Sequence, residues 1–122
     1  MSAPEDVYER IENRLVSHGL YVTDLERGEE ALEVTYETVH VDADAEAPGV
    51  PDRDIGRLCN VLREFREEGW DPVDLRAVAT TLEGERLGTW RAEAAWFREL
   101  GRDDITETEF SQRVLETVET PP

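Results

Sequence analysis

The segment "ALEVTYETV", residues 31–39, constrains the fold most strongly, because apolar and polar side chains alternate along it. The apolar positions are Leu32, Val34 and Tyr36, and Glu or Thr follows each of them. A period of two residues is typical of a strand with one face against the core and the other in water. The alternation breaks at Thr38, where we expect a strand end or a bulge. The segment therefore predicts a sheet that is covered on one side only.

The strand pattern occurs in two places, which predicts two hairpins. The run at 20–25 pairs with 31–40 in the first hairpin, and the second lies within residues 73–92. A two-residue turn at Glu83 and Gly84 would set the register of the second hairpin. Large side chains then lie opposite small ones on one face, in the pairs Ala77–Trp90, Ala79–Gly88 and Leu75–Ala92. Such pairs suit a face that helices cover.

Apolar residues at helical spacing predict four helices. They cover residues 3–18, from about Pro51 to just before Gly69, 92–100, and 106–117. The last has the clearest start, because Thr106 and Glu109 form a capping box and Ile105 with Phe110 forms a hydrophobic staple.

The predicted order of elements is α-β-β-α-β-β-α-α. Hairpins pair their strands antiparallel, and the polar strand faces indicate water on one side. We therefore predict an α+β fold of two layers, in which helices cover one face of a four-stranded antiparallel sheet made of two hairpins. A length of 122 residues fits a single domain over 1–122, with residues 118–122 as a frayed tail.

The charge indicates the working environment. Thirty Asp and Glu face thirteen Arg and no Lys, for a net charge of −17. Such a charge repels itself in dilute buffer, whereas molar salt shortens the screening length to about 3 Å. Because the acids are scattered along every predicted element, we favour a halophile's cytoplasmic protein over an acidic mimic of nucleic acid.

Several classes of function are disfavoured. No run of eighteen apolar residues predicts a membrane span, and the acidic start "MSAPEDVYER" does not read as a secretory signal. Direct binding of nucleic acid is disfavoured, because phosphate contacts need cationic surface and the net charge is −17. The phosphate-binding and nucleophile motifs are absent, so we expect no cofactor. We expect a cytoplasmic location.

The spacing of Asp42, Asp44 and Glu46 is similar to the start of a calcium loop. An EF-hand loop that began at Asp42 would need Gly at its sixth position and a bidentate Glu at its twelfth. Those positions hold Ala47 and Arg53. We therefore expect no metal site and interpret this segment as an acidic connector.

His40 lies four residues after Tyr36, on the nominal same strand face. This pair could transfer a proton, but no nucleophile or oxyanion hole is marked beside it. Packing at the strand end is the simpler interpretation, and a pocket near Tyr36, His40 and Trp90 is the alternative. The lone Cys59 lies on the flank of an apolar helix face and is interpreted as a small hydrophobic residue.

Arginines gather in one region. Residues 53–66 carry four Arg and two acids, and Arg53 and Arg57 fall together on the outer face of the predicted helix. In the second hairpin, Arg76 lies opposite Arg91 on the wet face, which is unfavourable for like charges. Exposed ion pairs, including Arg63 with Glu67, would explain these residues without a site. Otherwise Arg53, Arg57, Arg76 and Arg91 are the candidates for contact with an anion or an acidic partner.

The segments "YETV", "GRLCNVL", "GTW" and "EFSQRVLETV", in this order and spacing, resemble a family of small uncharacterised haloarchaeal proteins. The resemblance covers most of the chain. It implies a halophilic, cytoplasmic protein and assigns no catalytic or binding residues.

Two functional hypotheses follow. The first is a non-enzymatic interaction or regulatory module that binds another protein, or a second copy of itself, through an Arg-bearing surface. The second is a small-ligand-binding domain or enzyme with a pocket near Tyr36, His40 and Trp90. Converging polar groups in one concave pocket would favour the second.

Overall fold

The structure, a computed structural model, describes residues 4–28, 30–41, 49–66 and 70–120. The helices are α1 (Pro4–Val16), α2 (Asp52–Arg66), α3 (Ala94–Gly101) and α4 (Glu107–Leu115). The strands are β1 (Leu20–Arg27), β2 (Ala31–Thr38), β3 (Asp74–Thr80) and β4 (Arg86–Ala92). The α+β class and the predicted order of the eight elements are confirmed. β2 ends at Thr38, where its alternation breaks.

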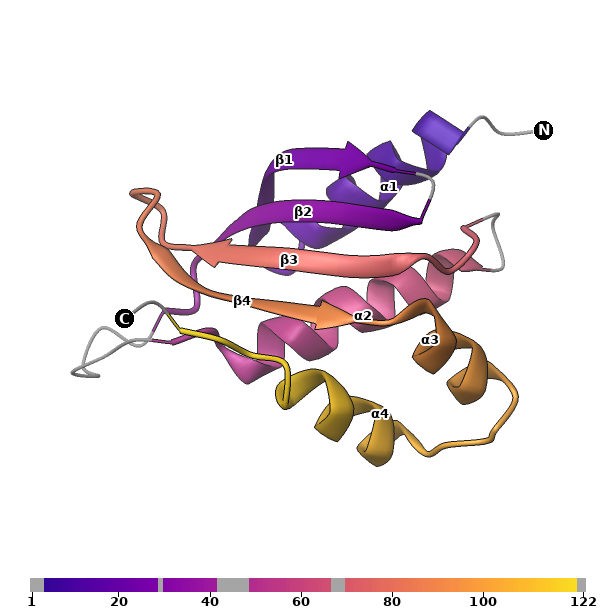
Figure 1. Cartoon of the computed structure of the whole chain (residues 1–122). Helices are drawn as coiled ribbons and strands as arrows, with labels where there is room; N and C mark the ends of the chain where they lie inside the picture. Colours follow the sequence, from indigo (N-terminus) through magenta and orange to yellow (C-terminus); the bar gives the residue numbers. More distant parts are fainter. Residues whose placement is uncertain (1–3, 29, 42–48, 67–69, 121–122) are drawn as a thin grey trace.

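The four strands form one sheet in the order β1-β2-β3-β4. The pairs β1–β2 and β3–β4 are antiparallel, but β2 and β3 are parallel. The prediction of a fully antiparallel sheet is therefore wrong. The reason is α2, which carries the chain from the end of β2 back to the start of β3 (Figure 1). A helix between neighbouring strands makes a crossover, and a crossover pairs them parallel.

The register predicted for β3 and β4 is confirmed, since Ala77 lies opposite Trp90, Ala79 opposite Gly88 and Leu75 opposite Ala92. The predicted two-residue turn is wrong. The N–H of Thr81 donates to the Glu85 carbonyl (2.8 Å), and the N–H of Gly84 donates to the Thr81 carbonyl (3.0 Å). Gly84 has a positive φ of 87°. The loop therefore has three residues and ends at a left-handed glycine, and a register shift after Ala79 absorbs the difference.

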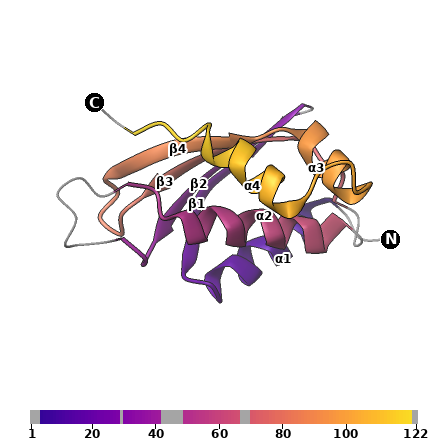
Figure 2. The same cartoon turned by 90° about the horizontal axis from the view of Figure 1, so that it is seen from below.

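The sheet has one dry and one wet face. Figures 1 and 2 show α1 and α2 against one face, with α3 and α4 beside β4. The buried strand residues facing the helices include Leu32, Val34, Tyr36, Leu75, Ala77, Ala79, Trp90 and Ala92. In the described part of the chain no helix covers the other face, where Glu33, Arg76 and Arg91 lie side by side on successive strands.

We expected residues 118–122 to form a frayed tail, but the segment is paired as far as Glu119. Glu119 and Thr89 exchange two backbone hydrogen bonds of 2.8 and 2.9 Å, beside the edge of β4. The hydroxyl of Thr117 accepts from the N–H of Arg91 at 2.9 Å. Residues 121–122 lie outside the described part. The capping box of α4 is confirmed, with Thr106 and Glu109 joined by two hydrogen bonds of 3.1 Å.

Candidate functional site

The outer side of α2 carries the two arginines that the sequence singled out. Buried side chains at helical spacing, such as Leu58 and Leu62, fix the opposite side of this helix in the core. Arg53, Arg57 and Asn60 are therefore turned outward, and all three are exposed. We call this set the arginine face. Within the described structure, no hydrogen bond or ion pair involves the side chain of Arg53 or Arg57.

Most other arginines have found a polar partner. Six of them lie within 4.0 Å of a carboxylate oxygen, in the pairs Arg14–Glu64, Arg63–Glu107, Arg76–Glu33, Arg91–Glu93, Arg102–Asp104 and Arg113–Glu99. Arg66 and Arg98 donate to backbone carbonyls. Among the described residues only Arg86, at the start of β4, shares the unpaired state of Arg53 and Arg57. In a chain with thirty acids, the arginine face therefore holds two of the three arginines that have no polar partner in the described part of the structure.

A groove runs beside the arginine face, between α2 on one side and α3 and α4 on the other. Its wider part is a hollow of about 850 Å³ lined by Asn60, Arg63, Glu64, Arg66, Phe97, Gly101 and Glu107. A narrower hollow of about 150 Å³ continues along α2 and α4, and Ile55, Gly56, Cys59, Phe110 and Leu115 are among its lining residues. We call the two together the α2–α4 groove.

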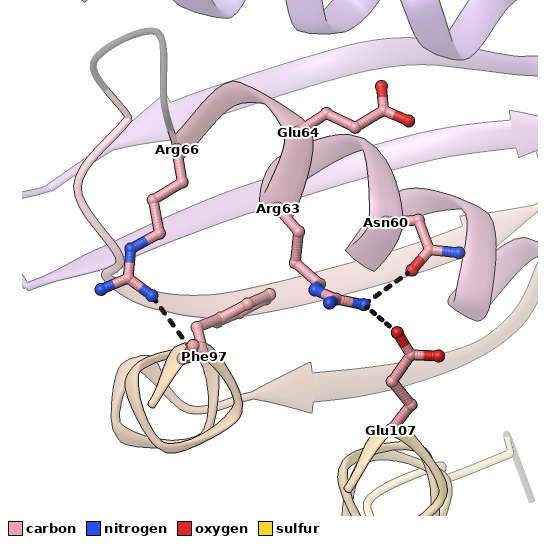
Figure 3. Close-up of a pocket in the computed structure, with 7 residues that line it drawn as sticks. Asn60, Arg63, Glu64, Arg66, Phe97 and Glu107 are labelled. Atoms are coloured by element: carbon pink, nitrogen blue, oxygen red, sulfur yellow. Dashed lines mark hydrogen bonds and ion pairs between the residues drawn. The ribbon is translucent and has the colours of Figure 1, made fainter. Parts of the chain in front are cut away.

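Two arginines of α2 point into this groove (Figure 3). The guanidinium of Arg66 donates to the Phe97 carbonyl at 3.2 Å and lies close to Gly101. A Cβ there would lie 2.5 Å from Arg66 Nη1. Arg63 is held more loosely, because its Nη1 is 3.4 Å from Asn60 Oδ1 and 3.3 Å from Glu107 Oε1. The predicted partner of Arg63, Glu67, lies outside the described residues.

Arg76 and Arg91 are cross-strand neighbours on the wet sheet face, as predicted. Their repulsion is relieved by acids on opposite sides. Arg91 donates to Glu93 at 2.9 Å, and Arg76 Nη1 lies 4.0 Å from Glu33 Oε1. Both arginines line a hollow of about 400 Å³ whose rim also carries Glu116 and Glu119. This pair is therefore surrounded by negative charge.

The three residues of the alternative pocket do not line a common hollow among those described above. Tyr36 and Trp90 are buried, and the indole Nε1–H donates to the Tyr36 hydroxyl at 3.0 Å. Burial raises the pKa of Tyr36 well above its ordinary value, and the nearby Asp54 and Cys59 add to the rise while the bond from Trp90 opposes it. Tyr36 therefore stays neutral and acts as a core hydrogen-bond acceptor.

His40 belongs to a different network, whose centre is Asp54 of α2. The Thr38 hydroxyl donates to Asp54 Oδ2 at 2.5 Å, and His40 Nδ1 lies 2.7 Å from Asp54 Oδ1. The backbone N–H of His40 donates to the Thr38 hydroxyl at 3.1 Å. Asp54 and Thr38 are fully buried. The network joins the end of β2 to the first turn of α2.

Sequence reasoning missed Asp54, although a signal was present. Asp54 precedes Leu58 by four residues and Val61 by seven, so it falls on the apolar stripe of α2. A carboxylate on a buried stripe needs hydrogen-bond partners, because burial without them is costly. His40 at the end of the preceding strand was available as such a partner.

The model of a family described as a domain of unknown function, DUF8159, matches residues 1–122. The chain belongs to the DUF8159 family. Searches of curated proteins and of solved structures found no match to this DUF8159 chain. The prediction that the chain belongs to an uncharacterised family is thereby confirmed.

Cys59 of the DUF8159 chain is buried in the helix layer. Burial raises the pKa of its thiol to about 12, and the nearby Arg63 offsets only part of this rise. A thiol that stays protonated at neutral pH is a poor nucleophile. The structure therefore supports the interpretation of Cys59 as a small hydrophobic residue.

The acidic connector with Asp42, Asp44 and Glu46 lies outside the described residues. In the part of the chain that the structure describes, no group of three or more His, Cys, Asp or Glu side chains could hold a metal ion. No described helix has the length and apolar character needed to cross a membrane.

Proposed function

We propose that the DUF8159 chain is a non-enzymatic interaction module that binds an acidic partner protein through the arginine face of α2. One observation carries this proposal: Arg53 and Arg57 are exposed on one helix face and have no ionic partner among the residues that the structure describes, in a chain of net charge −17. An exposed guanidinium without an ion pair in the described fold can bind a carboxylate on another protein.

We further propose that this contact forms in concentrated salt, as expected for a halophile's cytoplasm. Molar salt removes the long-range repulsion between two acidic proteins, because the screening length falls to about 3 Å. A bidentate bond between guanidinium and carboxylate depends on short-range geometry and is weakened less. The arginine face could then select a partner that the rest of the surface neither attracts nor repels.

Salt should also stabilise the fold. We expect the thermal midpoint to rise steadily from dilute buffer to molar KCl, because screening lowers the repulsion among the acids. Differential scanning calorimetry over a KCl series measures this. A midpoint that stays constant across the series would contradict the halophilic part of the proposal.

The alternative function has less support. A pocket enzyme built on Tyr36, His40 and Trp90 would need these side chains to converge on one hollow. Instead, Tyr36 and Trp90 satisfy each other in the core, and His40 is engaged by Asp54. The interaction module is the function that the geometry supports best.

The test is a pull-down in molar KCl with the tagged chain as bait, from a lysate of the native source. We expect the double substitution Arg53→Ala/Arg57→Ala to lose a partner that the unsubstituted chain retains, with an unchanged thermal midpoint. Arg86→Ala is the matched control, because Arg86 is also exposed and unpaired within the described structure. Identical partner lists from all three folded baits would reject the proposal.

A further inference from the structure

The open face of the sheet carries a row of four charged side chains, one from each strand. Glu26 of β1 lies opposite Glu33 of β2, which lies beside Arg76 of β3. Arg76 in turn lies opposite Arg91 of β4. All four are exposed, and no described helix covers this face (Figure 2). We call this set the charged row; across the sheet it reads acid, acid, arginine, arginine.

Each half of the charged row is unfavourable by itself. Like charges directly opposite each other on neighbouring strands destabilise the pair, and both Glu26–Glu33 and Arg76–Arg91 are such pairs. Glu26 forms no ion pair with any residue that the structure describes. The pairs Arg76–Glu33 (4.0 Å) and Arg91–Glu93 (2.9 Å) are exposed. Because a guanidinium has several N–H donors, both arginines can hold a further carboxylate.

The charged row is complementary to its own reverse. A two-fold axis along the strands, midway between β2 and β3, would place a second copy face to face with the first and reverse the order of its strands. β1 of each copy then lies over β4 of the other, and β2 lies over β3. Glu26 of one copy meets Arg91 of the other, and Glu33 meets Arg76. Each of the four side chains therefore gains an opposite charge across the interface.

We propose that the open sheet face is a dimer interface between two copies of this chain, held by the charged row. Two sheets stacked face to face with nearly aligned strands are a common arrangement. The inference is independent of the proposed function, because α2 packs on the opposite face of the sheet. In the dimer the two α2 helices belong to the outer layers, so both arginine faces stay exposed.

The neighbouring row of the same face also fits a second copy. Its members are Asp24, Thr35, Val78 and Thr89, in the order of the strands. The same two-fold axis brings Thr35 onto Val78 and Asp24 onto Thr89, so no like charges meet in this row. A uniformly acidic partner would face the acids of the charged row, and a basic partner would face its arginines. A second copy avoids both conflicts.

The interface is small and acids lie at its rim. Strands rise about 3.3 Å per residue and lie about 4.8 Å apart, so a face of four strands of about seven residues measures about 19 Å by 23 Å. This footprint is roughly half of the 800 Å² per partner of a standard interface, which predicts weak association. Glu116 and Glu119 at the rim oppose the contact. Molar salt screens this repulsion more than direct contacts, so we expect the dimer in concentrated salt.

Sedimentation equilibrium over a concentration series in molar KCl measures the dimer. We expect the unsubstituted chain to show a monomer–dimer equilibrium. Arg76→Glu/Arg91→Glu makes the whole charged row acidic and should weaken the dimer about a hundredfold or more, because like charges then face each other. Arg53→Glu/Arg57→Glu is the matched control. It changes the net charge equally, but on α2, and should leave the dimer intact.

Reversal of the other half of the charged row tests complementarity itself. Glu26→Arg/Glu33→Arg makes the row cationic and should also prevent self-association. An equimolar mixture of this variant with Arg76→Glu/Arg91→Glu should form a heterodimer. All four substitutions in one chain invert the row and keep the net charge, so the dimer should return. Loss through misfolding would not be reversed in this way, and the thermal midpoint of each variant checks its fold.

The remaining outcomes overturn the inference. It fails if the unsubstituted chain stays monomeric up to about 1 mM in molar KCl, or if the dimer survives Arg76→Glu/Arg91→Glu. It fails if neither the mixture nor the fourfold variant dimerises. It also fails if Arg53→Glu/Arg57→Glu dissociates the dimer, because the contact then lies on α2. Loss of a pull-down partner from Arg53→Ala/Arg57→Ala tests the proposed function separately, since those residues lie outside this interface.

Discussion

The exposed arginines of α2 and those of the open sheet face differ in their surroundings. On the sheet, Glu33 of β2 lies within reach of Arg76, and Glu93, just after the end of β4, lies within reach of Arg91. On the outer side of α2, the exposed Asp52 precedes Arg53, but neither Arg53 nor Arg57 forms an ion pair within the described structure. The two pairs of arginines look alike in the sequence, but only the sheet pair forms ion pairs in the described structure. An arginine cluster marks a candidate site only after its neighbours in space are known.

The two sides of α2 can be compared in the same way, because the buried inner side carries Asp54 and the exposed side carries Asp52. Substitution of Asp54 should lower stability the most. Asp54→Ala leaves the buried Thr38 hydroxyl without its acceptor and releases His40. We expect a loss on the order of 3 kcal/mol in the free energy of unfolding, as for a broken buried pair. Chemical denaturation measures it. Asp52→Ala, an exposed acid in the same helical turn, is the control and should stay within about 0.5 kcal/mol.

Cys59, also on the inner side, should make stability fall at alkaline pH. The unfolded thiol loses its proton near its ordinary pKa of 9.0, whereas the folded thiol keeps it to about 12. The folded state binds more protons in this window, so its stability is fully present below about pH 9 and is lost as pH rises through the window. Cys59→Ala should remove a slope of up to about 1.4 kcal/mol per pH unit. The slope of the free energy of unfolding against pH is compared for the unsubstituted chain and Cys59→Ala between about pH 9.5 and about pH 11, inside this window. Equal slopes for the two proteins would refute this account.

The smallest effect tests the comparison between the arginine pairs themselves. Arg91→Ala breaks the ion pair with Glu93 and should cost up to about 1 kcal/mol, as exposed pairs do. Arg53→Ala breaks no pair and should change stability by less than about 0.5 kcal/mol. Both substitutions remove one positive charge, so the difference between them reports the local contacts of Arg91, which are the ion pair with Glu93 and the approach to the Trp96 ring. If Arg53→Ala costs as much as Arg91→Ala in parallel denaturation curves, Arg53 is bound within the fold and the distinction fails.

Local patterns predicted the elements well because each depends on neighbouring residues. The alternation in residues 31–38 marked β2, and the capping box at Thr106 marked the start of α4. The β3–β4 register followed from opposing large and small side chains, even though the turn at Gly84 has three residues. The parallel pairing of β2 and β3 was missed because hairpin signals describe only adjacent strands joined by a turn. The parallel pairing results from the path of α2 between the two strands, and no short stretch of sequence predicts that path.

The candidate site was predicted only in part. Arg53 and Arg57 could be placed on an outer helix face from spacing alone. Their lack of partners could not, because it depends on which acids the strands and α4 place nearby. Glu107, for example, reaches Arg63 from 44 residues away in the chain.

Calorimetric titration of the partner recovered in the pull-down, in molar KCl, tests the central claim most directly. It compares the unsubstituted chain with Arg53→Ala/Arg57→Ala and with Arg76→Ala/Arg91→Ala, which remove equal charge from the two regions. We predict that the α2 substitutions raise the Kd about tenfold or more, whereas the sheet substitutions leave it nearly unchanged. Equal losses from both doubles, or a loss from the sheet double alone, would contradict the claim that the arginine face of α2 holds the partner.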